Sequence, residues 1–131
     1  MKDSEFQLLS QRLRRVDFEI NKGFKNKSKG IRLKLFPEAE VHKDKKENKA
    51  IVIFKLKIFD KKELEKYPFF MNLEIEGVFS WSENVDNIDE YLKINAPAVL
   101  MSYLRSIVTQ LTVFAGYPPL ILPLIDFTKD K

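Results

Sequence analysis

Few side chains in this sequence have the type and spacing that catalysis needs. The chain has no cysteine, which excludes thiol nucleophiles, disulfides and thiolate metal sites. Its single histidine, His42, lies in a run of charged residues, where a solvated side chain is expected rather than a general base. Glu74 and Glu76 share one face of a predicted strand, but a solvated sheet face explains this carboxylate pair better than acid–base chemistry does.

The glycines form no phosphate-binding loop. They occur at positions 23, 30, 77 and 116 and match neither G-x-G-x-x-G nor the P-loop pattern, so nucleotide hydrolysis is not supported. One histidine and no cysteine also leave no basis for a multi-histidine or thiolate metal centre. The sequence therefore predicts a protein that is not an enzyme and that carries no cofactor and no metal.

Length and charge predict one domain, residues 1–131, with a basic surface. The 23 Lys and Arg residues exceed the 19 Asp and Glu residues, for a net charge of +4. Basic residues gather between Lys22 and Lys34 around Phe24, the minimum for a single-stranded nucleic-acid site, but no established nucleic-acid-binding motif accompanies them. Nucleic acid is not expected as a partner.

Residues 1–5 lack the apolar core of a signal peptide, which favours the cytoplasm.

Four strands are predicted from alternating or β-branched segments. They cover residues 6–20, 31–35, 50–59 and 69–81, and the last has Gly77 at a bulge or a close approach. The second strand is expected to stop at Pro37, and the charged run 42–49 is expected to be a solvated connection. A short helix is possible around 88–92.

One long helix is predicted to begin with Asn95 as N-cap and Pro97 in its first turn, and to stop at Gly116. Arg105 is its only charged residue between positions 98 and 113, so the helix should be buried on more than one side. Its apolar run is too short for a membrane span, which needs about 20 residues. We therefore expect it to pack between its own sheet and a second subunit, with Leu100, Tyr103, Leu104, Ile107, Val108 and Leu111 at the interface.

The segment 117–127 is rich in proline and apolar residues. Proline excludes a helix or a central strand, so an extended segment lying against the domain is predicted. Such a segment can border a groove.

These features together resemble the SecB family of export chaperones. The resemblance is carried by Asn95-Ala96-Pro97, by the helix with Tyr103 and Arg105, and by the run Ala115–Phe127, AGYPPLILPLIDF. Upstream, Phe6–Leu8, Val16–Glu19 and Glu76–Ser80 are similar to the first and last strands of that family. The resemblance implies an α+β fold, in which a four-stranded antiparallel sheet packs against one long helix, with most of the second C-terminal helix of the family lacking.

The family likeness implies a holdase that binds unfolded or precursor polypeptides, without cofactor or catalysis, as a homotetramer built as a dimer of dimers. The heavy load of eleven phenylalanines suits exposed apolar grooves. The candidate polypeptide-binding residues are Phe36, Phe54, Phe69, Phe70, Phe79, Trp81, Tyr117 and Leu120. Ordinary core packing remains an equal alternative for each, and Phe70, which is out of phase with its neighbours, is expected to be exposed.

The resemblance also implies a docking surface for the export ATPase SecA, at Glu19, Phe70, Glu74 and Glu76. Arg15 and Asn72 stand where the family has acidic residues, so this docking is expected to be weakened. Two alternatives to an export chaperone stay open. One is a SecB-like chaperone dedicated to a single partner, such as the antitoxin of a toxin–antitoxin system, and the other is a structural assembly protein.

Overall fold

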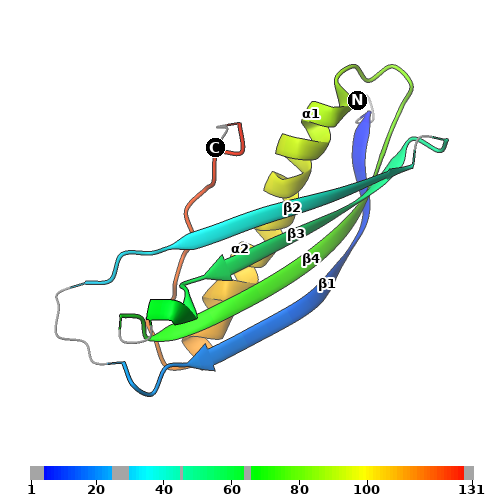
Figure 1. Cartoon of the computed structure of the whole chain (residues 1–131). Helices are drawn as coiled ribbons and strands as arrows, with labels where there is room; N and C mark the ends of the chain where they lie inside the picture. Colours follow the sequence, from blue (N-terminus) through cyan, green and yellow to red (C-terminus); the bar gives the residue numbers. More distant parts are fainter. Residues whose placement is uncertain (1–4, 25–29, 45, 64–65, 129–131) are drawn as a thin grey trace.

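Four strands form one antiparallel sheet, and one long helix lies across one of its faces (Figure 1). The structure is a computed structural model and describes residues 5–24, 30–44, 46–63 and 66–128. The strands are β1 (Phe6–Ile20), β2 (Leu35–Asp44), β3 (Lys49–Ile58) and β4 (Phe69–Trp81), in the order β1-β4-β3-β2. The predicted α+β class and the antiparallel sheet are confirmed.

The second strand differs from its prediction. Residues 31–34 are not in a strand, and β2 instead starts at Leu35, contains Pro37 and continues through the charged run to Asp44 opposite Lys49. The continuation of β2 past Pro37 and through the charged run has one cause, which is that β2 lies at an edge of the sheet. An edge strand tolerates a residue without an N–H and keeps charged side chains in water.

The helix begins earlier than predicted. Asn95 is not an N-cap, since its backbone is helical (φ −73°, ψ −42°) and its side chain makes no capping hydrogen bond. The helical path starts with α1 (Ile88–Glu90), passes through the π-turn η2 (Tyr91–Asn95) and continues as α2 (Ala96–Phe114). In a regular helix the ring of Pro97 would clash with the carbonyl four residues back, and a widened turn relieves that clash.

The helix ends as predicted, at a glycine in the left-handed region. Gly116 has φ +88°, its N–H donates to the Val113 carbonyl, and the N–H of Tyr117 donates to the Thr112 carbonyl, both at 3.0 Å. This Schellman-type pattern satisfies the last carbonyls of α2 and turns the chain back along the domain. Residues 117–128, called the strap below, follow in extended form beside α2.

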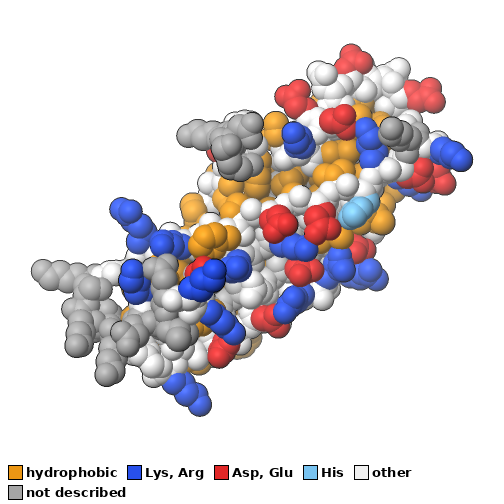
Figure 2. Space-filling view, viewed as in Figure 1, with side chains coloured by type: hydrophobic (Ala, Val, Ile, Leu, Met, Phe, Trp, Pro, Cys, Tyr) orange, Lys and Arg blue, Asp and Glu red, His pale blue; other side chains and the backbone are white. Residues whose placement is uncertain are grey.

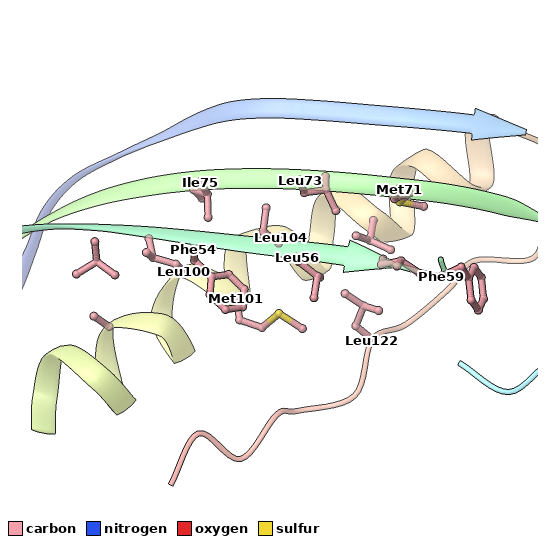
Figure 3. Packing of buried hydrophobic residues seen from close by; sticks show 14 of the residues in the cluster. Phe54, Leu56, Phe59, Met71, Leu73, Ile75, Leu100, Met101, Leu104 and Leu122 are labelled. Carbon is pink, nitrogen blue, oxygen red and sulfur yellow. The ribbon is translucent and has the colours of Figure 1, made fainter. Parts of the chain in front are cut away.

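The core lies between the sheet and α2, and the strap closes one side of it. Figure 3 shows Leu100 and Leu104 of the helix facing Leu73 and Ile75 of β4, with Leu122 of the strap beside Leu56 of β3. All six of these side chains are at most 1% exposed. Burial of several large apolar side chains at about 1.5–3 kcal/mol each is the main source of stability here.

Gly77 was predicted to mark either a bulge or a close approach, and the structure shows a close approach. The irregularities in the β1–β4 register lie elsewhere, between Leu8 and Ser10 and between Leu13 and Arg15. A Cβ on Gly77 would lie 2.8 Å from Leu100 Cδ2 and 2.9 Å from Phe79 Cε1. We therefore expect Gly77→Ala to lower the free energy of unfolding by about 1–3 kcal/mol in urea denaturation.

The control for this variant is Gly30→Ala. No atom lies within 4 Å of a Cβ at Gly30, and its φ is not in the left-handed region. Its stability should stay within about 1 kcal/mol of the wild type. Equal losses in both variants would show that the contact with Leu100 is not the cause.

Candidate functional site

Polar side chains of α2 hold the strap in place. Thr109 Oγ1 donates to the Leu120 carbonyl at 2.8 Å, and Arg105 Nε donates to the Leu122 carbonyl at 3.0 Å. The N–H of Leu120 donates to Thr112 Oγ1, also at 3.0 Å. These bonds satisfy backbone groups that no strand partner reaches, so the few polar residues on this helix serve to bind an extended chain.

Ring contacts and one buried leucine fix the inner side of the strap. Leu122 has no exposed surface, and the ring of Phe127 stands edge-on to Phe54 with 5.7 Å between centroids. Tyr117 packs on Phe69 at 5.2 Å, and its hydroxyl donates to the Pro68 carbonyl at 3.1 Å. The predicted extended segment against the domain is confirmed.

The outer side of the strap and the end of α2 expose large apolar side chains. Phe114 is 85% exposed, Leu124 82% and Ile121 70%. We call these three residues the apolar strip. Because the inner side of the strap is anchored, the exposed side chains are held outward on a fixed backbone. Exposed apolar surface marks a site that binds another chain when it forms a contiguous patch.

A second apolar row lies along β1, on the same face of the sheet as α2. Leu13, Val16 and Ile20 stand opposite Ile75, Leu73 and Phe69 of β4 and remain 39–46% exposed. The helix contacts mainly β4 and β3, which leaves β1 less covered. The half-buried strand predicted from alternation is thus more open than expected.

Half of the predicted polypeptide-binding residues, four of eight, belong to the core. Phe54 and Phe79 have no exposed surface, and Phe69 is 5% exposed. The expectation that Phe70 is exposed is wrong: it faces away from α2, opposite Glu19, yet it is only 5% exposed and joins the buried cluster. The other candidates keep some accessible surface; Trp81, Tyr117 and Leu120 are partly buried, and Phe36 is 42% exposed.

The predicted docking carboxylates lie on the outer face of the sheet, away from α2, and each is paired with a cation. Glu76 contacts Arg12 Nη2 at 3.1 Å, and Glu74 lies 3.8 Å from Arg15 Nη1. Glu19 contacts Lys61 Nζ at 2.7 Å. Figure 2 shows acidic and basic side chains intermixed along the strands. These three carboxylates are therefore not free to pair with a basic partner unless their present ion pairs open.

A further ion pair joins the edge strand β2 to β3, between Glu40 and Lys55. Lys55 Nζ lies 2.7 Å from a carboxylate oxygen of Glu40. The hydrogen bond from Lys55, and a second one with His42, lower the pKa of Glu40, and the bond to Glu40 raises the pKa of Lys55. Both groups are solvent-exposed, so screening keeps this pair from being a large source of stability.

The predicted interface residues of α2 divide into two groups. Leu100, Leu104 and Val108 have no exposed surface, so a partner chain cannot reach their side chains while the domain keeps this packing. Ile107 and Leu111 pack partly against the core. The helix face that remains open carries Tyr103, at 40% exposure, together with Val99 and Val113, which the sequence patterns did not single out.

No cluster of metal-ligating side chains occurs among the described residues. Within the same residues, no helix is long and apolar enough to cross a membrane. The described surface thus combines exposed apolar side chains with predicted docking carboxylates that are paired with cations.

Sequence comparison places the chain in a family. The family model described as preprotein translocase subunit SecB matches residues 2–129, so the chain belongs to the SecB family. The protein-export protein SecB of Ruegeria sp. (strain TM1040) is 30% identical over 131 residues, covering 94% of this chain and 77% of that protein. An uncharacterized protein of Methanocaldococcus jannaschii is 32% identical over 116 residues, covering 87% and 74%. A shorter match to SecB of Anaplasma marginale spans 49% of this chain and 38% of that protein.

A solved structure shares the fold. It is the Mycobacterium tuberculosis Rv1957 SecB-like chaperone in complex with a ChAD peptide from the Rv1956 HigA1 antitoxin. The TM-score is 0.72 at 19% identity, covering 92% of this chain and 91% of that chain. The predicted SecB-like fold is confirmed.

Proposed function

We propose that this protein is a cytoplasmic holdase chaperone that binds unfolded polypeptides on the apolar strip. The observation that carries the proposal is the outward display of Phe114, Ile121 and Leu124, at 70–85% exposure, on a backbone anchored by Leu122. Membership of the SecB family supports it. Each client side chain that packs on such a strip removes apolar surface from water, and the contact does not require a particular sequence.

The proposal is tested by light scattering from a chemically denatured protein that is diluted into buffer. Purified chaperone at a stoichiometric ratio should suppress aggregation. Adding ATP should not change the degree of suppression, because a holdase prevents aggregation by binding its client and hydrolyses no nucleotide. An unrelated folded protein of similar size and charge serves as control. No suppression with any of several unfolded substrates would rule out the holdase function.

A chaperone dedicated to one partner is the second candidate. It is favoured by the neighbour in fold, whose structure holds an antitoxin peptide. The paired state of Glu19, Glu74 and Glu76 also supports a role with weak docking on an export ATPase. A dedicated chaperone should bind one peptide at least about a hundredfold more tightly than generic unfolded chains, a difference of about 2.8 kcal/mol. Affinities across a panel of peptides separate the two functions.

We further propose that the chain forms a homo-oligomer, a dimer of dimers, in which β1 pairs with β1 of a second copy. The strand has 15 residues and lies at an edge of the sheet. Along it, the basic residues Arg12, Arg14 and Arg15 precede the acidic residues Asp17 and Glu19. Antiparallel pairing of two such strands about a twofold axis between these two groups sets the basic group of one strand against the acidic group of the other. The open row Leu13, Val16 and Ile20 would then be covered.

Replacing Leu13 and Val16 with lysine should halve the mass of the assembly or reduce it to the 15.4 kDa monomer in multi-angle light scattering. Inward-pointing charges on an edge strand oppose pairing because they must be desolvated. Val41→Lys with Ile51→Lys, at similar exposure on β2 and β3, should leave the mass unchanged. A wild-type protein that is already monomeric would contradict the oligomer itself.

A further inference from the structure

One end of the sheet is strongly basic. At this end β1 stops, β2 starts, and the chain between β3 and β4 crosses over. Among the described residues between positions 20 and 37, three are basic, Lys22, Arg32 and Lys34, and none is acidic. The exposed cations that the structure describes at this end are Lys22, Arg32, Lys34, Lys57, Lys61, Lys62 and Lys66. Of these, Lys61 is paired with Glu19 at 2.7 Å, and Asp60 lies beside it in the sequence. Figure 2 shows Lys and Arg side chains gathered at the lower left of the view.

Acidic side chains concentrate at the opposite end. The segment 82–90, which follows β4, carries Glu83, Asp86, Asp89 and Glu90 and no Lys or Arg. The molecule therefore has a charge gradient along the strands, although its net charge is only +4. Such a gradient orients an approaching charged chain before contact.

A hollow on the outer face of the sheet adjoins the basic end. Its volume is about 210 Å³, enough for one or two side chains, and its wall includes Phe36 of β2, Lys57 of β3 and Asn72 of β4, which lie in one cross-strand row. Phe36 is 42% exposed, and Lys57 Nζ lies 5.7 Å from the centroid of its ring. Among the described residues, no carboxylate pairs with Lys57. The hollow thus offers an aromatic wall beside a cation.

Two carboxylates, Glu38 and Glu74, also line this hollow, and they limit the kind of partner that fits it. Glu74 lies 3.8 Å from Arg15, and Glu38 stands opposite Lys55 in the register of β2 and β3. A continuous phosphate backbone would meet these two acids, and Phe36 is the only ring of the hollow on which a base could stack. A polypeptide, whose side chains alternate in type and direction, can place apolar and acidic groups separately.

The basic end also lies close to Phe114, the residue of the apolar strip at the end of α2. The hydrogen bond from the Tyr117 hydroxyl to the Pro68 carbonyl ties the end of α2 to the chain between β3 and β4, and Phe114 is three residues before Tyr117. Lys61 and Lys62 belong to that same connection. A bound chain can therefore contact apolar side chains and ammonium groups at one end of the domain.

We propose that the basic end and the hollow beside Phe36 select polypeptide segments in which apolar residues are flanked by Asp or Glu. This inference rests on the proposed polypeptide-binding function and adds a preference in client charge. Acidic flanks reach the lysines, an apolar side chain fills the hollow against Phe36, and the rest of the segment is free to continue to the apolar strip. Because the cations are exposed, the preference weakens as salt rises.

Three fluorescent peptides with one apolar centre and acidic, neutral or basic flanks test this preference by anisotropy. At low salt the full-length protein should bind the acidic peptide about tenfold more tightly than the neutral one and bind the basic one least, and the difference should shrink at 0.5 M salt. Lys57→Gln with Lys62→Gln should remove most of the preference. Lys46→Gln with Lys49→Gln, which removes the same charge at the other end of the sheet, should keep it.

Each outcome bears on a different claim. Equal affinity for the three peptides, with the neutral peptide still bound, overturns the charge preference and leaves the holdase function standing. Absence of binding to all three overturns the holdase function and this inference with it. A single-stranded oligonucleotide that displaces the acidic peptide at equal or lower concentration would show that the surface binds polyanions in general, which also overturns the inference.

Discussion

Replacing the apolar strip with polar residues should abolish most client binding without unfolding the protein. In the triple variant Phe114→Gln, Ile121→Thr and Leu124→Gln, three side chains that are 70–85% exposed lose their apolar surface. If each contributes about 1 kcal/mol when a client covers it, the loss is about 3 kcal/mol, or on the order of a hundredfold in affinity. Titration of a labelled unfolded substrate measures this change.

A second triple variant controls for a general loss of surface apolarity. Ile31→Thr, Val41→Thr and Ile51→Thr alter residues that are 38–41% exposed and are not part of the strip. Substrate affinity should change by less than threefold, and both triple variants should unfold within about 1 kcal/mol of the wild type because exposed positions contribute little to stability. If the two triples lose affinity equally, the strip is not the binding surface.

Truncating the anchor of the strap should have the largest effect on stability. Leu122 has no exposed surface and lies among core residues of the sheet and α2 (Figure 3). Leu122→Ala leaves a cavity there, so we expect a loss of about 2–5 kcal/mol in the free energy of unfolding. For a domain of this size, thermal denaturation should show a midpoint lower by on the order of 10 °C.

Hydrogen exchange separates local release of the strap from weakening of the whole domain. The N–H of Leu120 donates to Thr112 Oγ1. Relative to the wild type, Leu122→Ala should speed the exchange of this N–H more than it speeds the exchange of amides in the middle of β4. Leu124→Ala is the matched control, since Leu124 is two residues away and 82% exposed. Its stability should stay within about 0.5 kcal/mol of the wild type. Similar losses in both variants would mean that Leu122 is not an anchor.

Several elements were predictable because their determinants are local. Alternation of apolar and polar residues predicted β4 with the observed bounds, Phe69–Trp81, and predicted β3 to within one residue. Gly116 marked the end of α2 because a positive φ is easiest for glycine. The prolines of the strap excluded regular structure there. Each of these features is decided by the backbone preferences of neighbouring residues.

The candidate site was predicted less well, because burial depends on distant contacts. Alternation placed Phe54, Phe79 and Phe70 on particular faces of strands, but it did not reveal which faces the helix, the strap and the ends of the sheet would cover. The strap was predicted to border a groove through Tyr117 and Leu120, whereas the most exposed side chains are their neighbours Ile121 and Leu124. In an irregular segment, no repeating period indicates which side faces outward.

The sequence by itself determined the SecB-like order of elements, the apolar helix and the extended proline-rich tail, since each follows from short-range preferences and from a pattern of residues along the chain. Only the tertiary structure decided that Arg105, Thr109 and Thr112 bind the strap, that the outer carboxylates are paired, and that α2 leaves the face of β1 open. These arrangements join residues far apart in the sequence. They depend on how the packed elements fill space and satisfy polar groups, which no local pattern encodes.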